Sequence, residues 1–364
     1  MSRPTQVTID LSALQHNLRQ VKQMAPQSAV IAMVKSNAYG HGLERVALAL
    51  HEADAFGVAC VEEGMQLRHA GIEKDIFLME GIFYENELPQ VVANHFTLIV
   101  HHLGQIDMLE KHPPTHPISV WLKVDTGMHR LGVSADEAAA CYARLMACPG
   151  VKKPIGIMTH FADADSNDRA RTLQQIETFD ALSQGLPGPR SLSNSAGVIA
   201  WPTAHGDLVR PGIMLYGASP LVGHRGVEHH LLPVMTLSSE LIEVKKVKKG
   251  ERVGYGGIWV CPEDMSVGIV AVGYGDGYPR HVREGVPVLV NRRPCPLIGR
   301  VSMDMITVDL RSQPDAKIGD PVLLWGAGLP VEVVAEYSET NAYELLTRIT
   351  QRVRVVVKSE ELVN

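Results

Sequence analysis

The sequence predicts an N-terminal (β/α)8 barrel of the TIM type, residues 1–230, followed by a C-terminal all-β domain, residues 231–364. Three observations support this prediction. From about residue 30 to 220, short apolar runs alternate with amphipathic stretches, as parallel strands and helices do. After about residue 230 the segments become alternating and β-branched, with glycine and proline between them. The 364 residues also exceed the usual size of one domain.

Eight apolar runs provide the strands that such a barrel needs. In chain order they are AVIAMVK, AFGVACV, DIFLME, FTLIV, ISVWLKVD, KPIGIMTHF, RSLSNS and GDLVR. The stretches between them, such as LERVALALHEA and SADEAAACYARLMA, carry apolar residues every three or four positions and are predicted helices. RSLSNS and GDLVR have the weakest strand pattern, so seven or nine strands would also be compatible with the sequence.

In the second half of the chain, six segments show the alternation or β-branching expected of strands. They are VMTLSSELIEV, SVGIVAVGY, VPVLV, MITVDL, DPVLLWG and RVRVVVKS. Only NAYELLTRIT has a helical pattern there. These features predict an all-β domain behind the barrel.

The composition excludes several classes of function. A net charge of −6 and 5% aromatic residues leave no basic or base-stacking surface for nucleic acid. No apolar run reaches the roughly 18 residues that span a bilayer, and the first residues lack an apolar signal core. We therefore expect a cytoplasmic protein that binds no membrane. The five cysteines show no C-x-x-C spacing and the 16 histidines no H-E-x-x-H, so no metal site is predicted.

Reactive and charged residues collect at the carboxyl ends of the predicted barrel strands. They are Lys35, Lys123, Asp125, His160, Ser195 and Arg210. In barrels of this type, those strand ends form the active site. A lysine after a buried strand can instead extend its charged head to solvent. The gathering of so many such groups on one rim favours a catalytic Lys35.

The last two barrel loops have the composition of a phosphate site, which barrels often place there. The loops read SNSAG (193–197) and RPGIMLYG (210–217). Ser195 offers a hydroxyl, while Gly212 and Ile213 can present backbone N–H groups. A barrel lysine beside a phosphate cradle indicates pyridoxal phosphate (PLP), because lysine forms the Schiff base and the loops hold the phosphate. Taken alone, two glycine-containing turns are common.

Along nearly its whole length the chain resembles alanine racemase, the barrel-type (fold type III) family of PLP enzymes. The matching motifs, in the order of the family, are VKSNAYGHG, WLKVDTGMHRLG, MTHFADAD, LSNSAG, LVRPGIMLYG, VGYGG, GYGDGYPR, GRVSMDM and NAYELLT. The resemblance implies an isomerase that interconverts L-alanine and D-alanine. Its D-alanine would serve cell-wall peptidoglycan, or the enzyme would work in alanine catabolism, and the sequence leaves that choice open.

The resemblance also implies roles for individual residues. Lys35 would carry PLP and act as the base for the D-enantiomer. Tyr255, supplied by the other subunit, would be the base for the L-enantiomer, and His160 and Arg210 would support it. Arg210 would also face the pyridine nitrogen. The phosphate would be held by Tyr39, Ser195, Gly212, Ile213 and Tyr343.

Substrate contacts and a second chain are implied in the same way. Arg130 would bind the substrate carboxylate and orient the cofactor, and Met303 of the partner would offer its backbone N–H. Tyr274 and Tyr343 would narrow the entrance. Because Tyr255 and Met303 would act in trans, the resemblance implies a homodimer with two shared sites.

Lys123 matches a position that is carbamylated in many members of this family. There the added negative charge would steady Arg130. An ordinary lysine that pairs with Asp125 is the alternative, and the sequence leaves both open.

Four other functions fit parts of the pattern. A broader-specificity amino-acid racemase shares the fold, but such relatives are often exported and no signal segment is predicted here. A barrel PLP decarboxylase also has a β domain, yet it fits VGYGG and SMDM poorly. A PLP-holding protein without turnover resembles an isolated barrel. A purely structural protein leaves the residues on the barrel rim unexplained.

Overall fold

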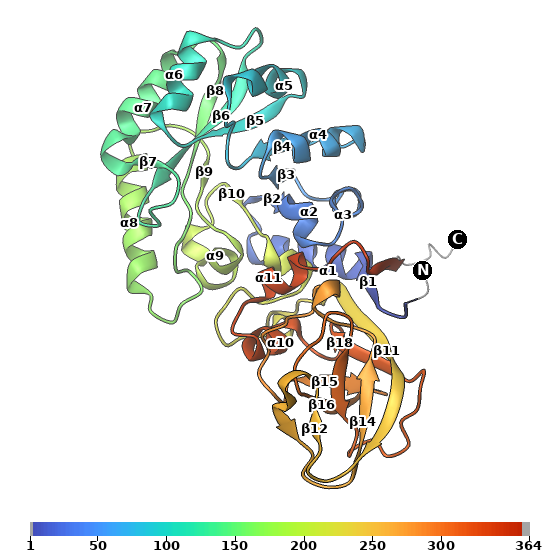
Figure 1. Ribbon diagram of the computed structural model, residues 1–364. Coiled ribbons are helices and arrows are strands. Elements are labelled where there is room, and N and C mark those ends of the chain that lie inside the picture. Colours follow the sequence, from blue (N-terminus) through green and yellow to red (C-terminus); the bar gives the residue numbers. More distant parts are fainter. Residues whose placement is uncertain (1–2, 359–364) are drawn as a thin grey trace.

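The computed structural model describes residues 3–358, which form a barrel and a β-rich half placed one below the other in Figure 1. The barrel contains eight parallel strands in the order β10-β2-β3-β4-β5-β6-β8-β9. Their bounds are β2 (Ala29–Met33), β3 (Ala55–Val58), β4 (Asp75–Leu78), β5 (Phe96–Val100), β6 (Ile118–Asp125), β8 (Val151–Met158), β9 (Arg190–Ser191) and β10 (Leu208–Val209). Each predicted apolar run forms one of these strands, so the predicted barrel is confirmed.

Backbone bonds between the segments of β9 and β10 close the barrel. The Asp207 N–H donates to the Arg190 carbonyl (2.8 Å), and the Arg210 N–H donates to the Ser193 carbonyl (2.9 Å). Both strands have only two residues, which explains why their sequence pattern is the weakest. Strands such as β5 are buried at every position, because helices cover the outside while side chains fill the inside.

Helices and short 3-10 turns alternate with the barrel strands along the chain and pack around the barrel. They are α1 (Leu11–Met24), α2 (Lys35–Tyr39), α3 (Leu43–Ala49), α4 (Val61–His69), α5 (Leu88–Ala93), α6 (Leu103–Lys111), α7 (Ala135–Ala147), α8 (Ala170–Ser183) and α9 (Ser195–Ala200), with short 3-10 turns η1 (Glu85–Glu87), η2 (Pro202–Ala204), η3 (Ile213–Tyr216) and η4 (Gly226–His229). The two-residue strand β7 (Val133–Ser134) pairs with β6 and leads into α7. Ser134 begins α7 with a capping box, since its hydroxyl accepts the Glu137 N–H while the Glu137 carboxylate accepts the Ser134 N–H.

The second half is an antiparallel barrel-like sheet. Its strands are β11 (Met235–Val247), β14 (Met265–Val270), β15 (Pro287–Val290), β16 (Arg293–Ile298), β17 (Ile306–Asp309) and β18 (Pro321–Trp325). The order β14-β17-β16-β15-β18-β11 closes because β11 also pairs with β14. A small hairpin, β12 (Arg252–Val253) with β13 (Trp259–Val260), the turns η5 (Tyr255–Gly257) and η6 (Tyr274–Asp276), and the helices α10 (Val331–Tyr337) and α11 (Ala342–Thr347) complete it.

The first strand of the chain belongs to this second sheet. Strand β1 (Gln6–Asp10) lies between β11, to which it is antiparallel, and β19 (Arg354–Lys358), to which it is parallel. Val7 and Ile9 are buried in it, while the residues between them are half-buried. The domain limits 1–230 and 231–364 stay a prediction, and residues 6–10 are a strand contributed by the first segment to the sheet of the second.

The sequence pattern of the second half leads to all six of its predicted strands and to α11. The last residue of the run RVRVVVKS, Ser359, lies outside the described residues. Helix α10 was missed because its sequence VEVVAEY is rich in valine, which favours strands when read alone. Val331, Val334 and Ala335 are buried at helical spacing against the core. Within residues 3–358, no helix is long and apolar enough to cross a membrane.

Asn17 on α1 fastens this helix to the segment that leads from the barrel to β11. Its Nδ2 group donates to the carbonyls of Leu215 (3.0 Å) and Leu232 (2.8 Å), and its Oδ1 accepts the Leu232 N–H (2.8 Å). The side chain is fully buried. All three hydrogen bonds of the Asn17 side chain are therefore made with backbone groups.

Replacing Asn17 with alanine should lower the free energy of unfolding by about 1 to 3 kcal/mol, because one buried and two partly buried backbone groups lose their partner. The measurement is the urea denaturation midpoint of the cofactor-free chain. Asn94→Ala is the control, since its side chain bonds only to Gln90 within its own helix. Equal midpoints for the two variants would contradict this role.

Candidate active site

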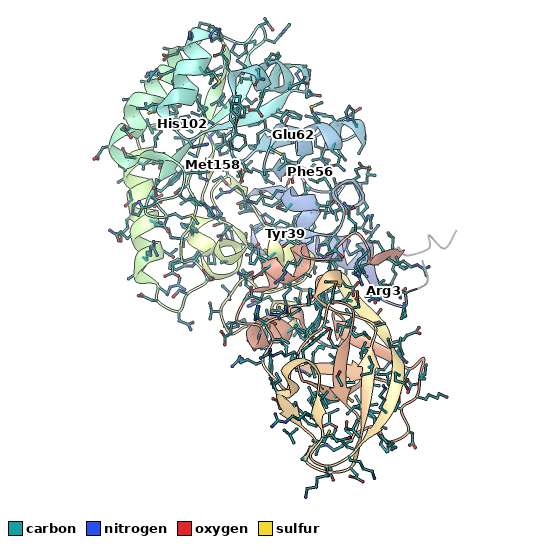
Figure 2. All side chains as sticks on the ribbon, viewed as in Figure 1. Arg3, Tyr39, Phe56, Glu62, His102 and Met158 are labelled. Carbon is teal, nitrogen blue, oxygen red and sulfur yellow. The ribbon has the colours of Figure 1, made fainter. Side chains whose placement is uncertain are left out.

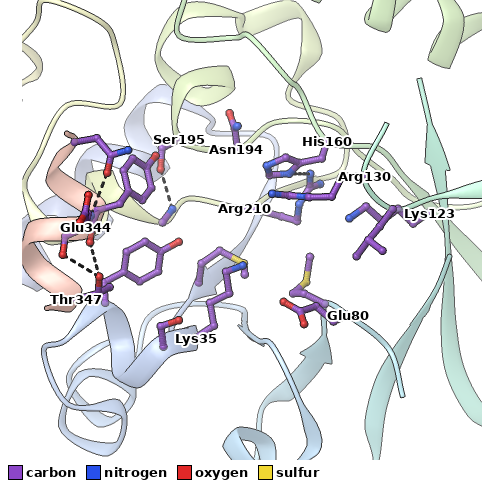
Figure 3. Close-up of a pocket in the computed structure, with 18 residues that line it drawn as sticks. Lys35, Glu80, Lys123, Arg130, His160, Asn194, Ser195, Arg210, Glu344 and Thr347 are labelled. Carbon is purple, nitrogen blue, oxygen red and sulfur yellow. Dashed lines mark hydrogen bonds between the residues drawn. The ribbon is translucent and has the colours of Figure 1, made fainter. Parts of the chain in front are cut away.

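A cavity of about 780 Å³ opens at the carboxyl ends of the barrel strands, with the segment around α11 as one wall (Figure 3). The barrel contributes Met33, Lys35, Ser36, Tyr39, Met79, Glu80, Lys123, Arg130, Leu131, His160, Asn194, Ser195, Arg210 and Gly212, and the second half contributes Asn341, Tyr343, Glu344 and Thr347. The cavity therefore lies where the two halves of the chain meet.

This cavity brings together most of the residues expected at the site. Among them are Lys35, Tyr39, Lys123, Arg130, His160, Ser195, Arg210, Gly212 and Tyr343. Ile213 follows directly, with its side chain fully buried in the core, so only its backbone is available to a ligand. Tyr255, Tyr274 and Met303 do not line this cavity of their own chain.

Lys35 follows the buried strand β2 and extends into the cavity (Figure 3). Its side chain is half-buried, and its amine has no hydrogen-bond or ion-pair partner among residues 3–358. Such an amine is available to a ligand. The helix label α2 covers an unusual backbone, since Ser36, Asn37 and Ala38 all have left-handed dihedral angles.

Arg210 lies at the buried floor of the cavity. Its Nη2 donates to the carbonyls of Thr159 (2.5 Å) and Leu192 (3.0 Å), its Nη1 donates to the Ser191 hydroxyl, and Nη2 lies 3.4 Å from His160 Nδ1. Burial lowers the pKa of Arg210 to about 10, so it still carries its charge at neutral pH. Arginine has no acceptor, so it can only donate to a group placed against it.

His160 is a neutral imidazole in this setting. Burial, and then the positive charges of Arg210 and Lys123, lower its pKa well below the ordinary value. Because Arg210 can only donate, His160 Nδ1 is the acceptor of their contact, which leaves the proton on Nε2. Its backbone carbonyl accepts from Gln175 Nε2 (3.1 Å), which fixes the loop after β8.

Lys123 is almost completely buried on β6. Burial, and then the charges of Arg210, Arg130 and Lys35, lower its pKa to about 8. The alternative pairing with Asp125 does not form. Asp125 Oδ1 accepts the N–H groups of the following turn, residues 127–129, and Oδ2 lies 3.2 Å from His129 Nδ1.

Hydroxyl and backbone groups gather at the opposite end of the cavity. The Ser195 hydroxyl accepts the Gly212 N–H (2.8 Å). The ring centroids of Tyr39 and Tyr343 lie 6.0 Å apart. Burial raises the pKa of Tyr39 to about 12, so its hydroxyl stays protonated and can donate. A Cβ on Gly212 would come within 2.3 Å of the Tyr39 hydroxyl, so only glycine allows this approach.

The remaining expected residues lie on the β-rich half. Tyr255, in the turn η5, is 72% exposed, and Met303 is 53% exposed. Two backbone bonds join the Tyr274 turn to the Met303 segment, from the Tyr274 N–H to the Ser302 carbonyl (3.1 Å) and from the Gly275 N–H to the Met303 carbonyl (2.9 Å). The Tyr255 phenol is therefore accessible from outside its own chain.

A buried carboxylate, to which the sequence assigned no role, lies beneath this surface. Asp276 is fully buried, and its Oδ2 accepts from Arg3 Nη2 (3.0 Å) and the Gly273 N–H (2.9 Å). Its Oδ1 lies 2.8 Å from Arg352 Nε. Arg352 Nη2 also donates to Asp304 Oδ1 (2.5 Å). The cluster fastens the loops of Tyr274 and Met303 to the start and end of the chain, which no local motif could indicate.

Glu80 was missed as well, although a signal for it exists. Met79 follows β4, and Glu80 comes next. Glu80 lies at the same rim as Lys35 and Lys123 (Figure 3). The run DIFLME ends in this carboxylate as AVIAMVK ends in Lys35. Among the described residues, no group of three or more His, Cys, Asp or Glu side chains is arranged to hold a metal ion.

Replacing Lys123 with methionine should stabilise the cofactor-free chain at pH 7, by up to about 3 kcal/mol. Below pH 8 the lysine is charged in both folded and unfolded chains, and only the folded chain bears the cost of its burial. Between pH 8 and 10.5 the folded chain loses the proton first, so this cost declines as the pH rises.

The measurement is the denaturation midpoint at pH 7 and at pH 10, in buffer free of carbon dioxide. The gain from Lys123→Met should be large at pH 7 and small at pH 10. Lys248→Met, at an exposed lysine paired with Asp264, is the control and should show no such gain. A gain that does not change with pH would contradict the burial of a charged Lys123.

This chain is similar to family models, relatives and solved structures of alanine racemases. Residues 9–220 match the family model "Alanine racemase, N-terminal domain", and residues 234–357 match "Alanine racemase, C-terminal domain". The chain is 51% identical over 361 residues to the alanine racemase of Coxiella burnetii (strain CbuK_Q154), which covers 98% of this chain and 99% of that one. The biosynthetic alanine racemase from Pseudomonas aeruginosa has a TM-score of 0.95 and 44% identity, with 98% and 99% covered. For the alanine racemase from Acinetobacter baumannii the TM-score is 0.93 and the identity 40%, with 98% and 100% covered.

Proposed function

The chain belongs to the alanine racemase family and is an isomerase of alanine, and we propose that its cavity binds PLP and that Lys35 and Tyr255 serve as two opposed bases. The observation that carries the proposal is the single cavity that joins an unpaired lysine, a buried arginine and a cluster of hydroxyl and backbone donors. The cavity alone would also suit a broader-specificity racemase or a barrel PLP decarboxylase, and similarity to alanine racemases over nearly the whole chain favours alanine as the substrate.

The cavity fits PLP, the cofactor that this family uses. Lys35 would hold it covalently through Nζ, and the phosphate would lie against Tyr39, Ser195, Gly212, Ile213 and Tyr343. The close approach of the Tyr39 hydroxyl to Gly212 makes a cradle that any side chain at 212 would fill. When bound, PLP supplies an electron sink for the electron pair left on Cα when its proton is removed.

Racemisation requires that a proton leave one face of Cα and that another arrive on the opposite face. One base on one side cannot do both efficiently, so two groups are needed. We assign the D-enantiomer to the Lys35 amine and the L-enantiomer to the Tyr255 phenol. Lys123, Arg130 and Arg210 line the same cavity as Lys35, whose amine has no hydrogen-bond or ion-pair partner among the described residues.

Arg210 and His160 would support this chemistry. The Arg210 guanidinium keeps its protons, so it can donate to the pyridine nitrogen but cannot leave a proton there. That arrangement weakens the electron sink and favours return of the proton over side reactions. The neutral His160, in contact with Arg210, would lie between Arg210 and the Tyr255 phenol and support the phenol as a base.

Arg130 would bind the alanine carboxylate with its planar guanidinium. Met303 of the other subunit would add its backbone N–H, and Tyr274 with Tyr343 would narrow the entrance around a small side chain. Lys123, whose pKa is about 8, has a neutral fraction at physiological pH that can react with carbon dioxide. We propose that it is carbamylated, releasing one proton, and that the carbamate steadies Arg130.

A homodimer is part of the proposal because Tyr255 and Met303 are exposed and lie outside the cavity of their own chain. Each site would combine Lys35 of one subunit with Tyr255 of the other. We further propose a cytoplasmic enzyme whose D-alanine supplies peptidoglycan or whose activity serves alanine catabolism.

The purified chain with PLP should form D-alanine from L-alanine, and Lys35→Ala should abolish this activity. Tyr255→Phe should retain deuterium exchange into D-alanine in heavy water, through Lys35, while exchange into L-alanine and racemisation fall at least about 100-fold. Proton NMR of the Cα–H signal measures both exchanges. Equal loss of both exchanges in Tyr255→Phe would contradict the assignment of one base to each enantiomer.

Mixing inactive Lys35→Ala chains with Tyr255→Phe chains should restore activity. After subunit exchange, half of the dimers are mixed, and one of their two sites carries both intact bases, so about a quarter of wild-type activity should return. The measurement is racemase activity after mixing, unfolding and refolding. Each variant treated alone is the control, and a mixture no more active than the two separate samples would show that the bases come from one chain.

A further inference from the structure

The backbone directly after Lys35 is strained. Ser36, Asn37, Ala38 and Tyr39 have φ angles of 54°, 53°, 51° and 53°, all in the left-handed region. None of them is glycine, and any residue with a Cβ adopts this conformation at a cost. Four such residues in a row persist only where surrounding contacts impose the geometry.

The Glu63 carboxylate supplies one of those contacts. Its Oε1 accepts the Ser36 N–H (2.7 Å), and its Oε2 accepts the Ala59 N–H (2.8 Å). Ser36 follows β2 and Ala59 follows β3, so the carboxylate ties the ends of two neighbouring strands together. Glu63 lies in the first turn of α4, where a negative charge is also favoured by the helix dipole.

His41 supplies the second contact. Its Nδ1 lies 2.9 Å from the Tyr39 carbonyl and 3.1 Å from the Ala38 carbonyl. Carbonyl oxygens only accept, so the proton is on Nδ1 and the ring is a neutral donor. Burial lowers the pKa of His41 to about 4, which keeps it in this form. The ring also packs against Tyr216, at 4.6 Å between centroids.

The strained turn sets two functional side chains at once. Lys35, labelled in Figure 3, immediately precedes it, and Tyr39, labelled in Figure 2, ends it. Both line the same cavity. Gly40 then leaves the turn with a φ of 83°, pressed so closely against the Leu346 carbonyl of α11 that a Cβ would lie 2.2 Å from it. A shift of the turn would therefore move the base and the end of the cavity that holds Tyr39 together.

We propose that Glu63 is a positioning residue for Lys35, which it aims at the reacting carbon by holding the left-handed turn of residues 36–39 in place. This inference rests on the proposed function, in which Lys35 carries the cofactor and removes the proton of D-alanine. Glu63 does not line the cavity, so it acts on Lys35 through the backbone, by holding the Ser36 N–H and tying it to the Ala59 N–H.

Glu63→Ala tests this inference, with Glu62→Ala as its matched control. Glu62 is exposed on the same helical turn, its carboxylate interacts with Cys60, and among the described residues it has no hydrogen bond or ion pair with residues 36–39. Glu63→Ala should lower deuterium exchange into D-alanine at least tenfold, while exchange into L-alanine falls much less, because only the Lys35 half-reaction is misaligned. The variant should also lose PLP faster on dialysis, as followed by absorbance, and Glu62→Ala should match the wild type in both measurements.

A second substitution separates positioning from simple support of the fold. Ser36→Gly removes the Cβ at a left-handed position, so it should raise the melting temperature of the cofactor-free chain and recover part of the stability that Glu63→Ala loses. In the double variant Ser36→Gly with Glu63→Ala, deuterium exchange into D-alanine should stay low. The turn is then less strained, but it still lacks the Glu63 carboxylate that holds it in place. Ser36→Ala removes the same hydroxyl, retains the strain, and should show no recovery of stability.

Each outcome has one meaning. If wild-type chain with PLP shows no racemisation, the proposed function fails before this inference is tested. If the wild type is active and Glu63→Ala behaves like Glu62→Ala, the positioning role is wrong. If Ser36→Gly restores exchange into D-alanine along with stability in the Glu63→Ala background, Glu63 only supports the fold and the inference is overturned.

Discussion

Positive charge held in a buried cavity is the constraint on which the rest of the site depends. Lys35, Lys123, Arg130 and Arg210 all line one space at the barrel rim, and two of them are almost completely buried. Burial and the neighbouring positive charges lower the pKa of Lys123 and of the His160 imidazole in this cavity. The same charges make the cavity receptive to an anionic cofactor and an amino-acid carboxylate.

The cavity also depends on the joining of two unlike halves. The barrel contributes the buried charges, while α11 of the second half brings Tyr343 and closes the side toward Tyr39. Gly40 and Gly212 show how close the fit is, since neither position has room for a methyl group. The cavity therefore forms only if the barrel and the second half of the chain contact each other.

A residue of the site can be predicted from the sequence when its position follows from the pattern of the residues next to it. Lys35, His160 and Arg210 follow apolar runs, and parallel strands that close into a barrel must carry them to one rim. Strand β1 escaped notice because its partners lie more than two hundred residues away, so nothing near residue 6 marks its pairing. Helix α10 escaped because valine favours strands until a core selects one helical face.

Glu63, His41 and Asp276 could not be recognised for a different reason. Each acts on backbone groups or on charged side chains brought near by the fold, and a carboxylate or imidazole in a polar stretch carries no mark of that. Tyr255 illustrates the opposite case. The resemblance assigns it a role in a neighbouring subunit, while its own chain shows only an exposed phenol in the turn η5.

The placement of β1 between β11 and β19 has a consequence for how the protein is made. Strand β1 is bordered on one side by residues 354–358, which are synthesised long after residues 6–10. During translation β1 therefore stays unpaired on that side until residues 354–358 have been made. The pairing that joins the first segment to the second sheet is thus a late step in assembly.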